Sequence, residues 1–239
     1  MVEVNGWLAI PDAFSAALFA RGGWDSVTLD AQHGLFEDRS LRDTLHALSA
    51  ASPRRYVRVP WNDPALVGRA LDLGADGVIV PMINNPAEAR ALAAASWYPP
   101  RGGRSFGPGL SALRAGAQPY TAFAAEIRVW GMIETREAFE SVEDIAAVDG
   151  ITGLFVGPND LALSLGLASG SNREEPQMLD AFRRIVAAAR AAGKDCGIYC
   201  TNAAYARRMA DLGFSMVTAA GDAALLSAAA AKVVEDVRA

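Results

Sequence analysis

The chain has 239 residues, 51% of them hydrophobic and 21% charged, which excludes an intrinsically disordered protein and predicts one globular domain over residues 1–239. Its 27 acidic and 22 basic side chains give a net charge of −5, which argues against a nucleic-acid partner. No apolar run approaches the roughly 20 residues of a membrane span, and the first residues lack a signal-peptide pattern. We therefore expect a cytoplasmic protein with no membrane partner.

Short runs of strand-forming residues alternate with runs of helical periodicity along the chain. The predicted strands are Val4–Ile10, Ser26–Asp30, Arg55–Pro60, Gly77–Pro81, Ile127–Glu134, Gly153–Gly157, Cys196–Cys200 and Ser215–Ala219. The predicted helices, one after each strand, are Ala13–Ala20, Leu41–Ala51, Pro64–Leu73, Pro86–Ala95, Arg136–Ala147, Pro176–Ala192, Ala203–Leu212 and Ala223–Val237. Most strands are apolar on both faces, which is typical of a covered parallel sheet. This pattern predicts an α/β fold, a (β/α)8 TIM barrel, with an open α/β sheet as the alternative.

Residues 97–118 interrupt the alternation with a long segment rich in glycine and proline. Long loops inside compact domains are usually functional or disordered. Because this segment comes after the fourth strand, we expect it to leave from the catalytic end of the barrel, where Arg101 and Arg104 could reach a substrate carboxylate. The alternative is a contact between subunits or a solvated lid.

Polar side chains stand at the ends of four predicted strands, and the catalytic groups of a TIM barrel lie at such C-terminal ends. The second strand ends in Asp30 and is followed by His33, and the third contains Arg58 near its end. The fifth strand ends in Glu134, and Asp160 follows the sixth. We therefore expect these five side chains to converge on one mouth of the barrel.

Glu134 and Asp160 come from adjacent strands, so their carboxylates are expected to lie close together. Two neighbouring carboxylates repel one another unless a cation or a shared proton lies between them, and oxygen ligands suit Mg²⁺ or Mn²⁺. We therefore predict a site for a divalent metal cation. The alternatives are that Glu134 caps a helix and that Asp160 is the N-cap of the following segment.

His33 and Arg58 are the candidates for proton transfer and for charge stabilisation. His33 is the histidine at the predicted mouth, because His46 falls within a helix, and an imidazole suits proton transfer at neutral pH. Arg58 can bind a carboxylate or an oxyanion with two hydrogen bonds. The alternative for Arg58 is a structural pair with Asp30 or Glu134.

Two scarce residue types exclude other chemistries. The two lysines, Lys194 and Lys232, precede the seventh strand and lie on the last helix, so no lysine is expected at the mouth to form a Schiff base. A metal must then stabilise any carbanion. The two cysteines, Cys196 and Cys200, would lie about 13 Å apart along one strand, which is too far for a disulfide, and we expect reduced core thiols.

Six sequence blocks carry a resemblance to a known family. They are Asp30-Ala-Gln-His33-Gly, Val57-Arg58-Val-Pro-Trp-Asn-Asp63-Pro64, Val80-Pro81-Met82, Tyr98-Pro99-Pro100, Ile133-Glu134-Thr135 and Gly157-Pro158-Asn159-Asp160-Leu161. The blocks span nearly the whole chain in order. On them the chain is similar to the class II, metal-dependent pyruvate aldolases, of the 4-hydroxy-2-oxoheptanedioate and 2-dehydro-3-deoxyglucarate aldolase type.

The resemblance implies a TIM-barrel enzyme, a carbon–carbon lyase for small molecules. Such a lyase cleaves or forms the aldol bond between a 2-oxo acid, pyruvate or hydroxypyruvate, and an aldehyde through a metal-bound enolate. The family's metal ligands match Glu134 and Asp160, which would hold Mg²⁺, Mn²⁺ or Co²⁺. The residues that match its substrate-binding positions are Arg58, Gly157, Pro158, Asn159 and Asp160.

The resemblance also implies catalytic roles for four residues. His33 would be the acid–base group and Arg58 would stabilise the enolate, and Asp30 matches a further position of this catalytic group. Asp72, contributed by a neighbouring subunit, would raise the basicity of the histidine. The implied assembly is a homo-oligomer, a hexamer built as a trimer of dimers that exchange their C-terminal helices.

Two positions depart from the family pattern. Met132 stands where many members have a glutamine, and Gln32 stands where many have an acid, so the substrate preference is not carried over. The alternative functions are a citrate-synthase-like or acyl-CoA lyase reaction on the same scaffold, and a barrel that binds a ligand without catalysis.

Overall fold

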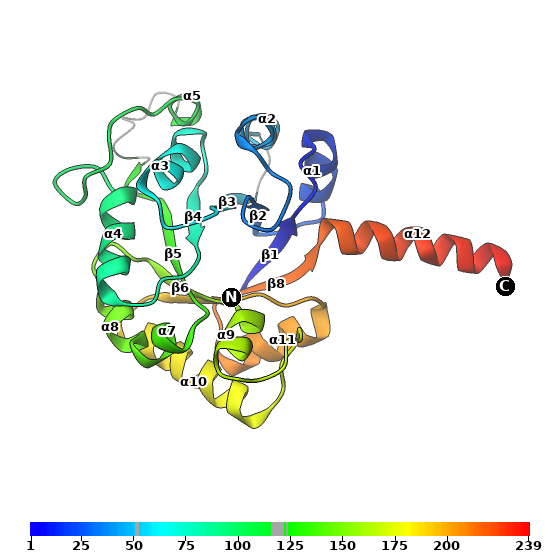
Figure 1. The fold of residues 1–239 in the computed structure, drawn as a ribbon. Coiled ribbons are helices and arrows are strands. Elements are labelled where there is room, and N and C mark those ends of the chain that lie inside the picture. Colours follow the sequence, from blue (N-terminus) through cyan, green and yellow to red (C-terminus); the bar gives the residue numbers. More distant parts are fainter. Residues whose placement is uncertain (51–52, 116–121, 123) are drawn as a thin grey trace.

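Eight parallel strands form a closed barrel in which each strand neighbours the next along the chain and the last pairs with the first (Figure 1). The structure is a computed structural model that describes residues 1–50, 53–115, 122 and 124–239. The strands are β1 (Glu3–Leu8), β2 (Ser26–Asp30), β3 (Arg54–Arg58), β4 (Gly77–Val80), β5 (Arg128–Ile133), β6 (Gly153–Val156), β7 (Asp195–Ile198) and β8 (Met216–Gly221). The predicted TIM barrel is confirmed, and the open sheet is excluded.

Helices surround the barrel (Figure 1). They are α1 (Ala13–Ala20), α2 (Asp38–Ala47), α3 (Pro64–Asp72), α4 (Pro86–Ser96), α5 (Ser111–Ala115), α7 (Arg136–Glu140), α8 (Val142–Ala147), α9 (Pro158–Ser164), α10 (Pro176–Ala191), α11 (Ala203–Leu212) and α12 (Asp222–Arg238). Within the described part of the chain, none of the helices has the length and apolar character that crossing a membrane requires.

Four helical segments differ from the predictions, and one of them, the short helix α5, lies within residues 97–118, which were predicted as a loop. Helix α2 begins before Leu41, because the Glu37 N–H donates to Ser40 Oγ at 2.8 Å and fixes the helix start there; its predicted end at Ala51 lies outside the described residues. The single helix predicted before β6 is instead two helices, α7 and α8, which meet at Ser141. Helix α9, which follows β6 directly, has no counterpart among the predicted helices.

The inside of the barrel is filled with large side chains. They are Trp7, Tyr56, Ile79, Trp130, Met132, Phe155 and Met216. Gly153 makes room for one of them, because a Cβ at this position would lie 2.4 Å from the Trp130 ring. A second apolar core lies between the strands and the surrounding helices. The packed interior leaves the strand ends as the place for polar chemistry.

Helix α12 extends away from the barrel (Figure 1). Of its 17 residues only Asp222 is buried, and its carboxylate accepts hydrogen bonds from the N–H groups of Ala9 at 2.9 Å and Ile10 at 3.0 Å. The large apolar side chains that the helix exposes are Leu225, Leu226, Val233, Val234 and Val237. Apolar side chains exposed along one helix are typical of a contact surface.

The segment after α4 lies at the foot of the barrel, where the strands begin, and not at the mouth, where they end. Helix α4 returns the chain to the foot, and Arg101 lines a cavity there together with the first residues of β3 and β5. Its guanidinium lies 3.6 Å from the centroid of the Trp97 ring. Arg104 pairs with Asp72 at the end of α3. The prediction that residues 97–118 leave from the catalytic end is therefore wrong; the last three of them lie outside the described residues.

Candidate active site

A cavity of about 260 Å³ opens at the mouth of the barrel. Seven of the nine predicted site residues line it, and Glu134 lies just behind its wall. The lining residues are Trp7, Ala9, Asp30, His33, Arg58, Met132, Phe155, Gly157, Pro158, Asn159, Asp160 and Tyr199. The structure thus brings together side chains that are up to 192 positions apart in the sequence, Trp7 and Tyr199 among them.

Asp30, the last residue of β2, holds Arg58 in place. Its carboxylate accepts hydrogen bonds from Arg58 Nε at 2.8 Å and Nη2 at 2.6 Å, and from Trp7 Nε1 at 3.2 Å. The backbone N–H groups of Gln32 and His33 donate to it at 3.0 and 3.2 Å. Burial acts to raise the pKa of Asp30, but the hydrogen bonds and charge of Arg58 outweigh it, so the pKa lies below its ordinary value. An ionised carboxylate with these five donors suits a positioning role better than proton transfer.

Arg58 forms the structural pair considered for it and still presents donors to the cavity. The pair with Asp30 uses Nε and one N–H of Nη2, so the two N–H groups of Nη1 and one of Nη2 are left. Its side chain is 11% exposed, and its guanidinium lies 5.0 Å from the centroid of the Trp7 ring. A half-enclosed guanidinium held on two sides can bind a second anion without reorganising.

Glu134 directly follows β5 and is buried. Its Oε1 accepts a hydrogen bond from the Met82 N–H at 2.7 Å, and Met82 has a φ of 56°, in the left-handed region that residues other than glycine rarely adopt. Burial raises the pKa of Glu134 to about 7; the Met82 N–H opposes this rise and the charge of Asp160 adds to it. Without a cation beside it, this carboxyl therefore holds its proton more firmly than an ordinary glutamate does.

Gly157 and Asp160 bring a second carboxylate next to the first. Gly157 is the N-cap of α9, and Asp160 lies in the first turn of that helix. A Cβ at Gly157 would lie 2.6 Å from Glu134 Oε2, so the glycine gives the glutamate its space. The Oδ1 atom of Asn159 is buried and, among the described residues, has no hydrogen-bond partner.

Helix capping does not explain the two acids. The N-cap of α7 is Thr135, whose side chain accepts a hydrogen bond from the Ala138 N–H at 3.1 Å. Since Gly157 is the N-cap of α9, Asp160 is not a cap either. The local alternatives for Glu134 and Asp160 are therefore excluded.

His33 and Asp72 are not brought together within one chain. His33 is exposed on the loop between β2 and α2, at the edge of the mouth cavity. Asp72 is the last residue of α3 and lines a different cavity, where it pairs with Arg104. A role for Asp72 beside His33 therefore needs a second subunit.

Lysine and cysteine lie where the sequence predicts them. Lys194 precedes β7 and donates a hydrogen bond to the Val148 carbonyl, and Lys232 pairs with Asp236 on α12, so neither lysine lines the mouth. Cys196 and Cys200 are buried free thiols, and burial raises the pKa of Cys200 to about 12. Schiff-base chemistry at the mouth is thereby excluded.

Sequence reasoning missed three residues of the site: Trp7, Met82 and Tyr199. The sequence pattern predicts only an ordinary apolar strand residue at Trp7. In the structure its indole N–H and its ring both contact the Asp30–Arg58 pair. Tyr199 follows β7 and packs edge-on against Trp7 with ring centroids 5.2 Å apart. The alternation of side chains along β1 could have placed Trp7 inside the barrel; the Met82 N–H has no signal in the sequence.

The mouth offers two carboxylates to a metal ion, Glu134 and Asp160, because the third, Asp30, is bound by Arg58 and Trp7. Among the residues that the structure describes, no group of three or more histidine, cysteine, aspartate or glutamate side chains is arranged to hold a metal ion. Mg²⁺ commonly binds to one or two carboxylates and completes its coordination with water and substrate oxygens. Glu134 and Asp160 therefore fit a hard divalent cation and do not fit a closed zinc site.

Comparison with known proteins assigns the family. A model of the HpcH/HpaI aldolase/citrate lyase family matches residues 6–229. The chain belongs to this family. The resemblance carried by the six sequence blocks is thereby confirmed, and so is the predicted class of enzyme, a carbon–carbon lyase.

Three relatives illustrate the similarity within the HpcH/HpaI family. The chain is 44% identical, over 98% of its own length and 93% of the other, to a hydroxypyruvate/pyruvate aldolase of Rhizorhabdus wittichii. It is 36% identical to a 4-hydroxy-2-oxo-heptane-1,7-dioate aldolase of Salmonella dublin, over 94% of this chain and 86% of that one. A crystal structure of an HpcH/HpaI family protein from Burkholderia cenocepacia superimposes with a TM-score of 0.92 at 31% identity, covering 100% of this chain and 95% of the other.

Proposed function

We propose that this chain catalyses the aldol cleavage of a 2-oxo acid and the reverse condensation of pyruvate or hydroxypyruvate with an aldehyde. The observation that carries the proposal is the placement of Asp160 and Arg58 in the mouth cavity, with the Glu134 carboxylate against Gly157 in its wall. The relatives at 44% and 36% identity are aldolases by name, which favours this reaction over a citrate-lyase-like one.

A divalent cation, Mg²⁺, Mn²⁺ or Co²⁺, is part of the proposal, with Glu134 and Asp160 as its ligands. The residues fit such an ion because both donors are hard oxygens and because a buried carboxylate beside a second one needs a positive neighbour. When bound, the cation would act as a Lewis acid on the oxygens of the 2-oxo acid.

The residues of the chain carry the proton and charge transfers. In cleavage, His33 takes the proton of the aldol hydroxyl, the carbon–carbon bond breaks, and its electron pair forms the enolate as the aldehyde leaves. The free N–H groups of Arg58 hold the negative oxygen that develops. Asp30 keeps Arg58 in that orientation, and a proton returned to the enolate carbon gives the methyl group of pyruvate. Gly157, Pro158 and Asn159 line the substrate side of the cavity.

The proposal includes a homo-oligomer, a hexamer of three dimers, in which dimer partners exchange α12. The exposed apolar side chains of α12 support this assembly, since a helix directed away from its own barrel needs another surface to cover it. In such an assembly Asp72 would reach His33 of a neighbouring subunit and raise its basicity.

Proton exchange at the methyl group of pyruvate tests the proposed function. We expect the protein with Mg²⁺, Mn²⁺ or Co²⁺ to exchange methyl protons for deuterium in D₂O, as followed by proton NMR, and the chelator-treated protein to lose this exchange. The measurement needs no knowledge of the aldehyde. Absence of exchange with all three metals would favour a barrel that only binds.

The substitution Gly157→Ala is expected to weaken metal binding without unfolding the protein. Alanine accepts the backbone at this position, with φ −93° and ψ 90°, but its Cβ would lie 2.6 Å from Glu134 Oε2 and 3.1 Å from Met132 Cε. We expect the Kd for Mn²⁺, measured by calorimetry, to rise about tenfold, the cost of misplacing one ligand. Gly68→Ala is the matched control, since a Cβ there meets no atom within 4 Å.

Metal binding is also expected to weaken as the pH falls below about 7. A protonated carboxyl cannot bind the cation, and the pKa of Glu134 is raised by burial to about 7, so below this pH each binding event must release a proton. The Kd for Mn²⁺ should therefore rise about tenfold per pH unit below 7 and level off above it. Calorimetry in two buffers of different ionisation enthalpy measures the released proton; a Kd that is constant between pH 6 and 8 would contradict this prediction.

A further inference from the structure

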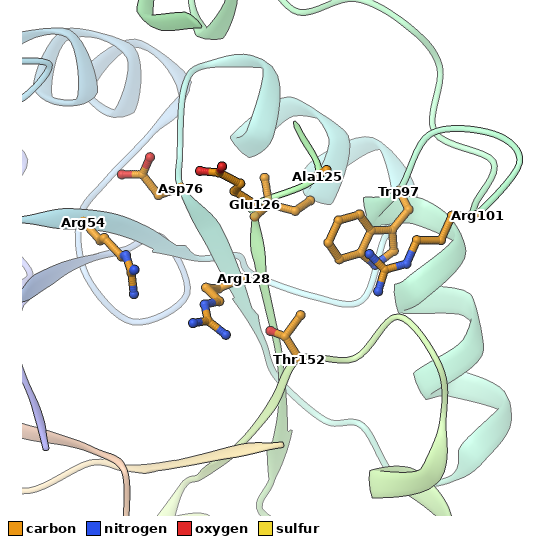
Figure 2. A pocket seen from close by; sticks show the side chains of 9 residues that line it. Arg54, Asp76, Trp97, Arg101, Ala125, Glu126, Arg128 and Thr152 are labelled. Atoms are coloured by element: carbon orange, nitrogen blue, oxygen red, sulfur yellow. The ribbon is translucent and has the colours of Figure 1, made fainter. Parts of the chain in front are cut away.

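A second cavity, of about 440 Å³, lies at the foot of the barrel, at the end opposite the mouth (Figure 2). We name it the foot pocket. It is formed by the residues that begin the strands, Arg54 of β3, Arg128 of β5 and Thr152 before β6, together with Trp97 and Arg101 from the segment after α4. It shares no lining residue with the mouth cavity.

Three guanidinium groups from three different segments line the foot pocket. Arg54 and Arg128 begin strands that flank β4, so the barrel holds their backbones rigidly. Arg101 lies flat against Trp97, and that ring is fixed in turn because its Nε1 donates to the Gly150 carbonyl at 2.7 Å. The three side chains are 54%, 36% and 44% exposed, in the order Arg54, Arg128 and Arg101. A ligand from solvent can therefore reach all three side chains.

The acids outside the pocket form few hydrogen bonds with these arginines. Glu3 lies 3.7 Å from Arg54, and Asp149 lies 4.0 Å from Arg101, both beyond hydrogen-bond distance. Of the three arginines, Arg128 has a hydrogen bond to a carboxylate, from Nη1 to Asp195 at 3.1 Å. A guanidinium has five N–H donors, and each of these three side chains is at least one third exposed, so each can donate to a further anion.

Two carboxylates also line the foot pocket. Asp76 is held by its neighbour Arg55, which donates to it from the backbone N–H at 2.8 Å and from Nε at 3.0 Å. Glu126 is exposed. In Figure 2 the Asp76 and Glu126 carboxylates lie on one side of the view and the guanidinium groups of Arg54 and Arg128 on the other. The pocket therefore offers guanidinium donors together with an exposed carboxylate, Glu126, that can accept a hydrogen bond from a hydroxyl group.

We propose that the foot pocket binds a small polyol that carries an oxyanion, a sugar acid or a sugar phosphate. The planar fork of a guanidinium matches a carboxylate or a phosphate, which it can bind with paired hydrogen bonds. Glu126, the exposed carboxylate of the pocket, accepts a hydrogen bond from a hydroxyl group of the polyol. The site is independent of the aldol reaction, since none of its residues touches the mouth cavity.

Calorimetric titration of the Mg²⁺-loaded, pyruvate-saturated protein tests the proposal. The probes are gluconate for the carboxylate form, glucose 6-phosphate for the phosphate form and glucose as the uncharged control. We expect one site per chain for at least one of the two anions, whose relative affinities identify the preferred anionic group, and no binding of glucose. Added salt should weaken the binding, as ion pairs of partly exposed groups require.

The variant Arg54→Ala/Arg101→Ala identifies the site. Neither arginine has a hydrogen bond to a carboxylate, so the double variant should fold, as a thermal melt will show, and its Kd for the bound anion should rise at least about tenfold. Arg207→Ala, an exposed arginine on α11, is the matched control and should bind like the unmodified protein. The proposal fails if neither anion binds, if glucose binds as well as they do, or if the folded double variant retains the original Kd.

Discussion

Replacing Glu134 with alanine is expected to reduce metal-dependent proton exchange of pyruvate by about 10³-fold or more, equivalent to about 4 kcal/mol of lost transition-state stabilisation. Glu134 is the buried member of the two proposed ligands, and its Oε1 is held by the Met82 N–H at 2.7 Å. No other carboxylate can take its place, because Asp30 is occupied by Arg58 and Trp7.

The measurement separates loss of the metal from loss of the fold. Calorimetry with Mn²⁺ should show a large rise in Kd for Glu134→Ala, while the melting temperature of the metal-free protein should not fall, because the variant removes a carboxyl whose charge is unfavourable where it is buried. Glu140→Ala, at an exposed glutamate at the end of α7, is the control and should leave both quantities unchanged. Full exchange activity in chelator-treated Glu134→Ala would refute the assignment.

The barrel could be predicted from the sequence because its signals are local. Asp63 and Asn85 each precede a proline, and in the structure each side chain accepts hydrogen bonds from the first N–H groups of its helix, for example from Ala65 at 2.7 Å. Strands with apolar side chains on both faces then required a covered parallel sheet. For the same reason the residues at the strand ends could be placed at the mouth from the sequence.

The contacts within the site could not be predicted, because they join residues that are far apart in the sequence. Met82 and Glu134 are separated by 52 positions, and their hydrogen bond depends on a left-handed backbone at Met82 that no residue type signals. The prediction that Arg101 lies at the mouth was wrong for a different reason. A segment that follows a helix begins at the foot of the barrel, and the prediction took the preceding strand as its reference.

The Arg58→Lys variant is expected to lower the rate of pyruvate proton exchange by about 10²-fold although the positive charge is kept. Arg58 binds both oxygens of Asp30 through Nε and Nη2 and still has N–H groups of Nη1 for the developing oxyanion. A lysine cannot bind Asp30 and the oxyanion in this way, since all of its N–H donors are on one nitrogen atom. Steady-state exchange rates over a range of pyruvate concentrations should show the loss mainly in kcat.

Arg69→Lys is the matched control, because it makes the same substitution at an arginine that also binds a carboxylate but lies outside the mouth. Arg69 also binds both oxygens of one carboxylate, Asp38, at 2.6 and 2.8 Å, but this pair is about half exposed at the surface. Exposed ion pairs contribute about 1 kcal/mol or less, so this variant should lose neither stability nor activity. If Arg58→Lys were as active as Arg69→Lys, Arg58 would serve only to neutralise Asp30, and the oxyanion would have to be held by other groups of the mouth.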